Sequence, residues 1–170
     1  STRKESSAAA DVYKRQIWIY EEKATLIPGV KDFLLRAQKK GVKIFYVTNR
    51  RTVYEEATKN NIKKLGLPFD DDVDVLLTRG ENGWGSSKAS RRLYVSENHR
   101  VIMMFGDNLN DFFDLPDKAD YVTRKESVLE YENMWGNKWF MLANPVYGHW
   151  EQSIYGLSLI HISEPTRQEA

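Results

Sequence analysis

The stretch VIMMFGDNLNDF, Val101–Phe112, decides the fold class of this chain. It opens with an apolar run closed by Gly106 and Asp107, which is typical of a buried strand in a parallel sheet. A carboxylate directly after such a strand lies at the carboxyl edge of the sheet, where α/β proteins bind ligands. Asp107 and Asp111 are therefore candidate site residues, although an Asx turn that caps a helix is an alternative for the same pattern.

Working outward from this stretch, short apolar runs alternate with segments of helical periodicity. Pro28 opens one helix and Gly41 stops it, while Thr52 is expected to cap the next helix, with Glu55 three residues later. Expected helices cover 17–25, 28–40, 52–65 and 87–98, and expected strands cover 42–47, 73–77, 101–105, 121–122 and 139–142. This alternation predicts an α/β fold with a parallel sheet.

The composition fits one globular domain, with 41% hydrophobic and 29% charged residues in 170. With 25 Lys and Arg against 24 Asp and Glu, the net charge of +1 gives no field that would attract nucleic acid or an anionic membrane. The chain has no cysteine, which excludes disulfides, thiolate zinc sites and a cysteine nucleophile. No apolar run approaches the roughly 20 residues of a membrane span.

Both ends of the chain differ in character from its middle. The strings DVYKRQ at 11–16 and LSLIHISEPTRQ at 157–168 resemble translated sequencing-adapter strings found at the edges of metagenomic assemblies. The alternative is an ordinary frayed tail and a short C-terminal strand. We expect residues 1–16 and 157–170 to be non-native tails and residues 17–156 to be part of an authentic domain.

Four residues of the middle suit phosphoryl transfer, which needs hydroxyl donors, a cation and carboxylates that hold a metal. In chain order they are Thr48, Lys88, Asp107 and Asp111, each expected at a strand end or a helix start. Taken singly, Thr48 also fits a helix-capping turn and Lys88 also fits a solvated surface position.

The order of these residues resembles the second, third and fourth motifs of haloacid dehalogenase (HAD) phosphatases. Three strings are similar to signatures of the class C acid phosphatases, the lipoprotein 5'-nucleotidase family: FYVTNR at 45–50, GDNLNDF at 106–112 and FMLANPVYGHWE at 140–151. The resemblance covers residues 17–156. It implies a Rossmann-like parallel sheet and Mg²⁺-dependent hydrolysis of phosphomonoesters, including nucleoside monophosphates, in the bacterial cell envelope. Nucleic acid is not an expected partner, and membrane contact is expected only through a lipid anchor outside this chain.

The resemblance also implies roles for individual residues. Thr48 would hydrogen-bond the transferring phosphoryl group, Asn49 would support the same loop, and Lys88 would neutralise phosphoryl oxygens. Asp107 would bind Mg²⁺, and Asp111 would fix Lys88 or a metal-bound water.

Two aromatic residues near the C-terminal end are candidate substrate contacts. By the same resemblance, Tyr147 and Trp150 would flank the substrate, where an aromatic face can stack on a nucleobase. Packing beside Pro145 and Gly148 is an equally good explanation of both.

The chain departs from the family at the first motif, Asp-x-Asp-x-Thr, which supplies the nucleophile and the general acid. No Asp-x-Asp precedes Thr48, and the string DDDVD at 70–74 follows it and is expected to form a solvated turn. We therefore expect the first, central strand to be missing and the chain as written to be inactive. A non-catalytic phosphate- or nucleotide-binding α/β module is the alternative. A phospho-receiver is disfavoured, because receivers place their lysine after the acidic residues and Lys88 precedes Asp107.

Overall fold

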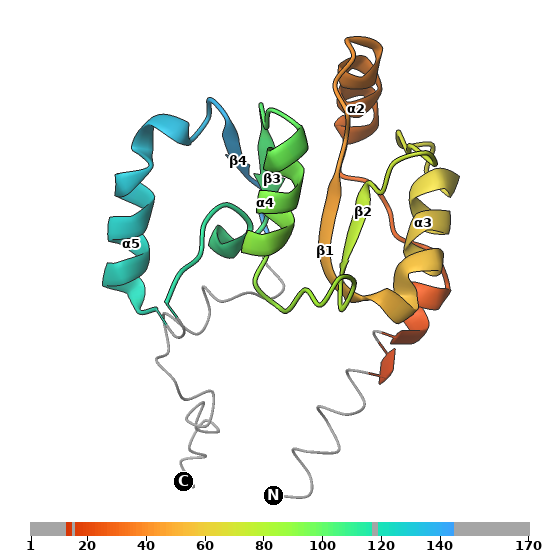
Figure 1. Cartoon of the computed structure of the whole chain (residues 1–170), viewed down its shortest axis with the longest axis horizontal. Coiled ribbons are helices and arrows are strands. Elements are labelled where there is room, and N and C mark those ends of the chain that lie inside the picture. Colours follow the sequence, from red (N-terminus) through yellow and green to blue (C-terminus); the bar gives the residue numbers. More distant parts are fainter. Residues whose placement is uncertain (1–12, 15, 117–118, 145–170) are drawn as a thin grey trace, which may run out of the picture. The chain divides into compact units, whose positions relative to one another are not determined.

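The computed structural model describes residues 13–14, 16–116 and 119–144 of the 170-residue chain (Figure 1). These residues form two compact units. The first comprises the described residues up to Ser86 together with Ser90–Arg92, and the second comprises Ser87–Ala89 and the described residues from Leu93 onward. Helix α4 (Ala89–Asn98) therefore contributes residues to both units.

The first unit is built from a two-stranded sheet and its helices. Along the chain it contains a helical turn over 16–20, α2 (Val30–Lys39), β1 (Tyr46–Arg51), the 3-10 helix η1 (Thr52–Tyr54), α3 (Glu55–Lys64) and β2 (Leu76–Arg79).

Helix α2 ends before Gly41, as predicted, but it begins at Val30, two residues after Pro28, which was expected to open it. Gly29 precedes it with φ 83° and Gly41 follows it with φ 80°, a left-handed conformation that glycine adopts without a Cβ penalty. None of the ten described residues of α2 is buried, and Phe33 on its apolar face is 41% exposed.

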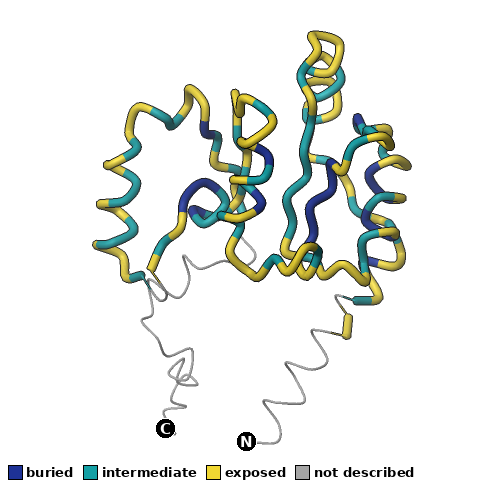
Figure 2. Tube along the Cα trace, viewed as in Figure 1, coloured by how far each residue is buried: buried dark blue, intermediate teal, exposed yellow. Residues whose placement is uncertain are grey.

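Strands β1 and β2 pair in parallel, with Tyr46 opposite Leu76 and Val47 opposite Leu77. Residues 75–78 are buried and form the centre of the unit (Figure 2). Both strands begin later than predicted, because the first backbone bond of the pair runs from Tyr46 N to Val75 O and residues 42–45 precede it. Thr48 consequently lies inside β1 and not after it.

The prediction that Thr52 caps the next helix is wrong. The helix α3 begins at Glu55, after η1, and its start has no side-chain cap. Thr52 Oγ1 instead donates to the Arg79 carbonyl oxygen and lies 3.1 Å from Thr78 Oγ1, so it joins η1 to β2. A capping pattern in the sequence competes with such tertiary partners.

The end of α3 follows the prediction. Gly66 has φ 70° and donates to Lys63 O, while Leu67 N donates to Ile62 O, as in a Schellman motif.

The second unit contains a second two-stranded parallel sheet. Its elements are α4, β3 (Met104–Gly106), η2 (Leu109–Asp111), α5 (Tyr121–Glu130), η3 (Glu132–Met134) and β4 (Trp139–Met141). Met104 lies opposite Trp139 and Gly106 opposite Met141. The strand β4 matches its predicted range closely, whereas β3 is shorter than predicted, since Val101–Met103 are 40–45% exposed and precede the first pair.

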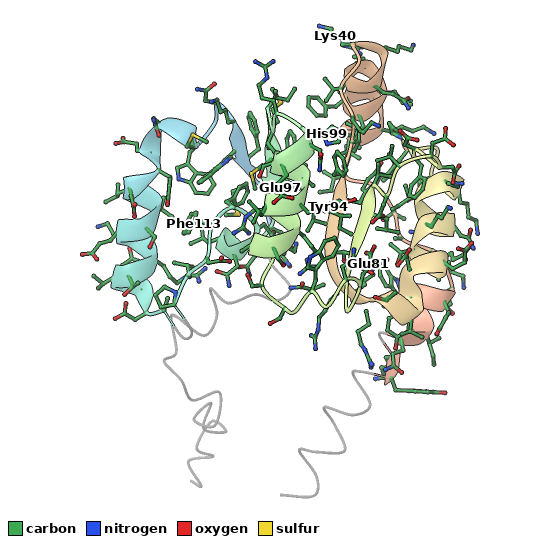
Figure 3. The ribbon with its side chains drawn as sticks, in the orientation of Figure 1. Lys40, Glu81, Tyr94, Glu97, His99 and Phe113 are labelled. Atoms are coloured by element: carbon green, nitrogen blue, oxygen red, sulfur yellow. The ribbon has the colours of Figure 1, made fainter. Side chains whose placement is uncertain are left out.

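The core of the second unit is aromatic. Leu109, Phe112, Phe113 and Trp139 are buried together, and Tyr131 stacks on Phe113 with ring centroids 5.0 Å apart. Figure 3 shows the position of Phe113, which lies within this core. This cluster holds η2, and with it the loop after β3, against β4.

The strand predicted at Tyr121-Val122 is wrong, because both residues open helix α5. Asp120 supplies the reason: its Oδ1 accepts the Thr123 amide at 2.8 Å and caps the helix. β-Branched and aromatic residues favour strands only weakly, and a cap can override that preference.

The predicted α/β class with parallel strands is confirmed, since both described strand pairs are parallel. Within the described residues, the two sheets have two strands each and none pairs with a third strand. No helix in this part of the chain is both long enough and apolar enough to cross a membrane.

Candidate functional site

The loop after β3 is shaped by close contact between Gly106 and Asp111. A Cβ placed on Gly106 would lie 2.5 Å from Asp111 Cβ and 2.8 Å from its Cγ, so only glycine fits here. Asp111 Oδ2 accepts the backbone amides of Asp107 and Asn108, and Asn108 Oδ1 accepts the Asn110 amide. This reciprocal capping fixes the position of the Asp111 carboxylate.

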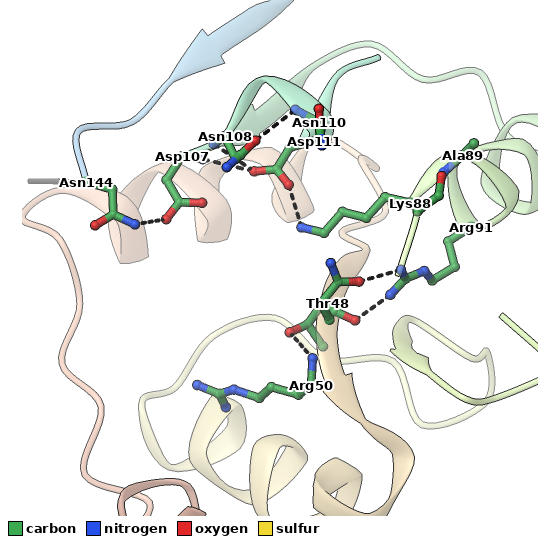
Figure 4. Close-up of polar contacts among 12 residues, drawn as sticks. Thr48, Arg50, Lys88, Ala89, Arg91, Asp107, Asn108, Asn110, Asp111 and Asn144 are labelled. Atoms are coloured by element: carbon green, nitrogen blue, oxygen red, sulfur yellow. Dashed lines mark hydrogen bonds and ion pairs between the residues drawn. The ribbon is translucent and has the colours of Figure 1, made fainter. Parts of the chain in front are cut away.

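The other oxygen of Asp111 binds the only lysine among the predicted site residues. Lys88 Nζ lies 2.7 Å from Asp111 Oδ1, and the two side chains are only 18% and 12% exposed (Figure 4). Lys88 itself is placed at the start of α4, where Ser87 Oγ accepts the Ala89 amide. Because the pair is largely removed from water, losing either partner leaves a poorly solvated charge.

Asp107 directly follows β3, as predicted, and its carboxylate is exposed. Asn144, three residues beyond β4, donates from Nδ2 to Asp107 Oδ2 at 2.6 Å. Mg²⁺ in proteins often takes only one or two carboxylates, with waters and phosphate oxygens completing its shell. Asp107 fits such a ligand, while the described residues contain no group of three metal-ligating side chains.

Thr48 and Asn49 belong to the first unit and are joined there by Arg91. Arg91 Nη1 donates to the Thr48 carbonyl oxygen, and its Nη2 donates to Asn49 Oδ1 at 2.6 Å (Figure 4). Thr48 Oγ1 accepts the Arg50 amide at 3.2 Å. Accepting that bond leaves the Thr48 hydroxyl hydrogen to be donated elsewhere.

The structure thus groups the predicted site residues within each unit. The second unit joins Lys88 to Asp111 and brings Asp107 beside them through its backbone amide. In the first unit, Arg91 donates hydrogen bonds to both Thr48 and Asn49. Tyr147 and Trp150 lie outside the described residues, and the roles of all seven residues stay predictions.

Sequence reasoning missed two contacts of these residues. Asn144 lies within the string 140–151 but carries no predicted role, and its bond to Asp107 depends on the pairing of β3 with β4. Arg91 carries no signal either, because one arginine beside another on a helix is normally a solvated surface residue.

The chain is similar to known proteins both in sequence and in structure. Residues 9–150 match the family model of the HAD superfamily, subfamily IIIB (acid phosphatase). The structure is similar to the class C acid phosphatase from Bacillus anthracis, with a TM-score of 0.75, 32% identity and 86% of this chain covered. It is equally similar to the tungstate-bound form of that enzyme, at 34% identity and a TM-score of 0.75. This chain spans 60% of the length of either structure.

Proposed function

We propose that the parent protein of this chain, which belongs to the acid phosphatases of HAD subfamily IIIB, hydrolyses phosphomonoesters, including nucleoside monophosphates. The observation that carries the proposal is the Lys88–Asp111 ion pair, fixed by the backbone amides that directly follow β3. In this ion pair the Lys88 ammonium group lies near the loop that carries Asp107, whose amide binds the other oxygen of Asp111. An ammonium group of this kind can neutralise phosphoryl oxygens.

Each described residue would contribute by binding or positioning. Thr48 would donate its hydroxyl hydrogen to a phosphoryl oxygen, and Asn49 would support the same segment. Lys88 would neutralise charge on the phosphoryl oxygens, and Asp111 would hold its ammonium group in place. Asp107 would bind Mg²⁺, which when bound supplies additional neutralisation of phosphoryl charge.

The chemical step itself requires residues that this sequence does not contain. In the proposed mechanism an aspartate attacks phosphorus to form an aspartyl phosphate, and a second carboxyl group protonates the leaving oxygen. No Asp-x-Asp precedes Thr48 in these 170 residues. We therefore propose that the chain as written binds phosphate without turning over substrate.

Two further parts of the proposal rest on family resemblance alone. Tyr147 and Trp150 would flank the substrate and stack on a nucleobase where one is present. The parent protein would act in the bacterial cell envelope.

The test uses a longer parent protein that includes the upstream motif. Release of inorganic phosphate from a nucleoside monophosphate and from an aryl phosphate would be measured with and without Mg²⁺. We expect Asp107→Asn to abolish magnesium-dependent turnover and Lys88→Ala to reduce it by at least about 100-fold, the scale of losing one group that stabilises developing charge. Asp72→Asn and Lys64→Ala, at exposed positions, are the matched controls.

Binding by the chain as written is measured separately, by titration calorimetry with orthophosphate and tungstate. Near-normal turnover in Asp107→Asn or Lys88→Ala would remove that residue from the mechanism. Phosphate release by the 170-residue chain, clearly above that of a Thr48→Val, Lys88→Ala, Asp107→Asn triple variant, would show that the nucleophile lies within it. Binding of phosphate by this chain and no turnover by the longer parent protein would favour the non-catalytic binding module.

A further inference from the structure

Strand β1 is irregular at the position of the predicted phosphate contact. Val47 pairs with Leu77 and Arg51 pairs with Arg79, so Thr48, Asn49 and Arg50 lie opposite the single residue Thr78. We call Thr48–Arg50 the bulged segment. Bulges re-aim side chains and interrupt the regular ladder of backbone bonds, so the polar groups of the bulged segment need partners of another kind.

Arg91 supplies those partners from the first turn of α4. Besides its bonds to the Thr48 carbonyl oxygen and Asn49 Oδ1, its Nη2 donates to the Gly85 carbonyl oxygen at 3.1 Å. One planar guanidinium group therefore connects the bulged segment to the loop that leads from β2 to α4. Lysine, with a single ammonium nitrogen, cannot reproduce this fork.

The burial of Arg91 is costly and calls for an explanation. Arg91 is 0% exposed and is the largest fully buried side chain among the described residues. Burial lowers its pKa, as do the nearby charges of Arg79 and Arg92, while the carboxylate of Glu81 opposes the shift. A buried cation is destabilising unless good geometry and hydrogen bonds compensate. Its acceptors include oxygen atoms of Thr48 and Asn49, the two residues predicted to form the phosphate-binding segment, so the buried guanidinium group holds that segment.

We propose that Arg91 is a positioning residue that holds the bulged segment in the shape in which Thr48 can donate its hydroxyl hydrogen to a phosphoryl oxygen. Arg91 donates a hydrogen bond to the Thr48 carbonyl oxygen, which fixes the backbone at Thr48. The Arg50 amide donates to the Thr48 hydroxyl oxygen, which orients the hydroxyl group. Its Nη1 and Nη2 groups donate to oxygens of Thr48, Asn49 and Gly85, so we expect it to act on the ligand through Thr48 and Asn49. The inference rests on the proposed function to the extent that Thr48 binds phosphate.

The first test needs no ligand. Amide hydrogen exchange of Arg50, whose N–H binds Thr48 Oγ1, is measured by NMR in the 170-residue chain and in Arg91→Lys. We expect exchange at Arg50 to be about tenfold faster in Arg91→Lys, the scale of one lost hydrogen bond, and exchange at the buried Leu77 to be unchanged. Arg100→Lys, at an exposed position, is the control and should change neither amide.

The second test is a double-mutant cycle read out by orthophosphate affinity. Arg91→Lys should weaken binding by about tenfold or more, as expected when a group that orients a ligand-binding residue is altered. Thr48→Val should weaken binding as well, and adding Arg91→Lys to Thr48→Val should have almost no further effect. Arg91→Met, which removes the charge and the Nη donors but keeps an unbranched apolar stem, should behave like Arg91→Lys if the variant folds.

The possible results separate this inference from the proposed function. Unchanged Arg50 exchange in Arg91→Lys would overturn the inference, and so would equal losses of affinity with and without the Thr48 hydroxyl. If the 170-residue chain binds no orthophosphate but Arg50 exchange still rises in Arg91→Lys, the phosphate-binding proposal fails and the positioning role stands.

Discussion

At the scale of single residues, the shape of the loop after β3 depends on the absence of one side chain. Gly106 is required by steric contact with Asp111, not by its backbone conformation, because its φ lies outside the left-handed region. The same contact brings the Asp111 carboxylate onto the Asp107 and Asn108 amides and presents its other oxygen to Lys88. A glycine thus determines where the lysine ammonium group lies.

Gly106→Ala is expected to lower the free energy of unfolding by about 1–3 kcal/mol, the usual cost of overpacking, and to displace Asp111 from Lys88. Urea denaturation measures the first effect and the NMR shifts of the Lys88 side chain measure the second. Gly85→Ala is the matched control, because a Cβ there meets nothing within 4 Å. Equal stability of both variants would show that Asp111 can move aside at little cost.

A second residue, Glu81, is tuned by its surroundings in the first unit. Burial raises its pKa to about 7, and a hydrogen bond with Asp74 and the charges of Asp74 and Glu55 act in the same direction. The Thr78 amide, which donates to Glu81 Oε2 at 3.2 Å, opposes them. The folded state therefore binds the Glu81 proton more tightly than the unfolded chain, whose carboxyl group has an ordinary pKa of 4.5.

This shift predicts that the contribution of Glu81 to stability is full below pH 4.5 and is lost as the pH rises towards about 7. Glu81→Gln should remove that decline, and Glu97→Gln, an exposed control on α4, should keep it (Figure 3). The measurement is the free energy of unfolding in urea at several pH values from 4 to 8. Asp70 and Asp71, whose pKa values are lowered by hydrogen bonds from lysine side chains, lose their stabilising contribution only as the pH falls below their ordinary pKa of 3.8, outside this window. An identical pH dependence in wild type and Glu81→Gln would contradict the assignment.

At the scale of elements, helix starts depend on which partner a polar side chain finds. Asp120 caps α5 through the Thr123 amide, and this bond lowers the pKa of its carboxyl group. Thr52, which has the sequence pattern of a cap, is bound to β2 instead. The side chain of Asp120 therefore caps its own helix, whereas the side chain of Thr52 connects η1 to β2.

Removing the Asp120 cap should destabilise α5 in particular. Asp120→Ala is expected to cost about 1 kcal/mol of unfolding free energy, as is typical of a lost N-cap, and to speed amide exchange in the first turn of α5. Asp72→Ala, at an exposed turn position, is the control. A change in exchange spread evenly over both units would argue against a local capping role.

At the scale of the whole molecule, the two ends remain a matter of prediction. The family match begins at residue 9, inside the segment 1–16 that the sequence marks as non-native, and it ends at 150. If the tails are foreign to the fold, deleting 1–16 and 157–170 should change the free energy of unfolding by less than about 1 kcal/mol, the size of a typical damaging mutation. A larger loss, measured by urea denaturation of the trimmed and untrimmed chains, would show that the ends pack against the domain.

The sequence alone determined the α/β class, the helices α2 and α4, the strand β4 and the order of Thr48, Lys88, Asp107 and Asp111. These features depend on local periodicity, on glycine and proline punctuation and on residue order, all of which can be read along the chain. The starts of β1, β2 and β3 could not be read in this way. An apolar run in the sequence indicates which residues are buried. A strand, however, begins at the first backbone hydrogen bond to the neighbouring strand, such as the bond from Tyr46 N to Val75 O.

The contacts between polar groups became visible only in the folded structure. Arg91 and Thr48 are 43 residues apart, Asp107 and Asn144 are 37 apart, and Lys88 and Asp111 are 23 apart. Such contacts are set by the register of paired strands and by the placement of α4, which no local pattern encodes. A buried arginine and a surface arginine look alike in a sequence, since what separates them is the set of oxygens that the fold brings to the guanidinium group.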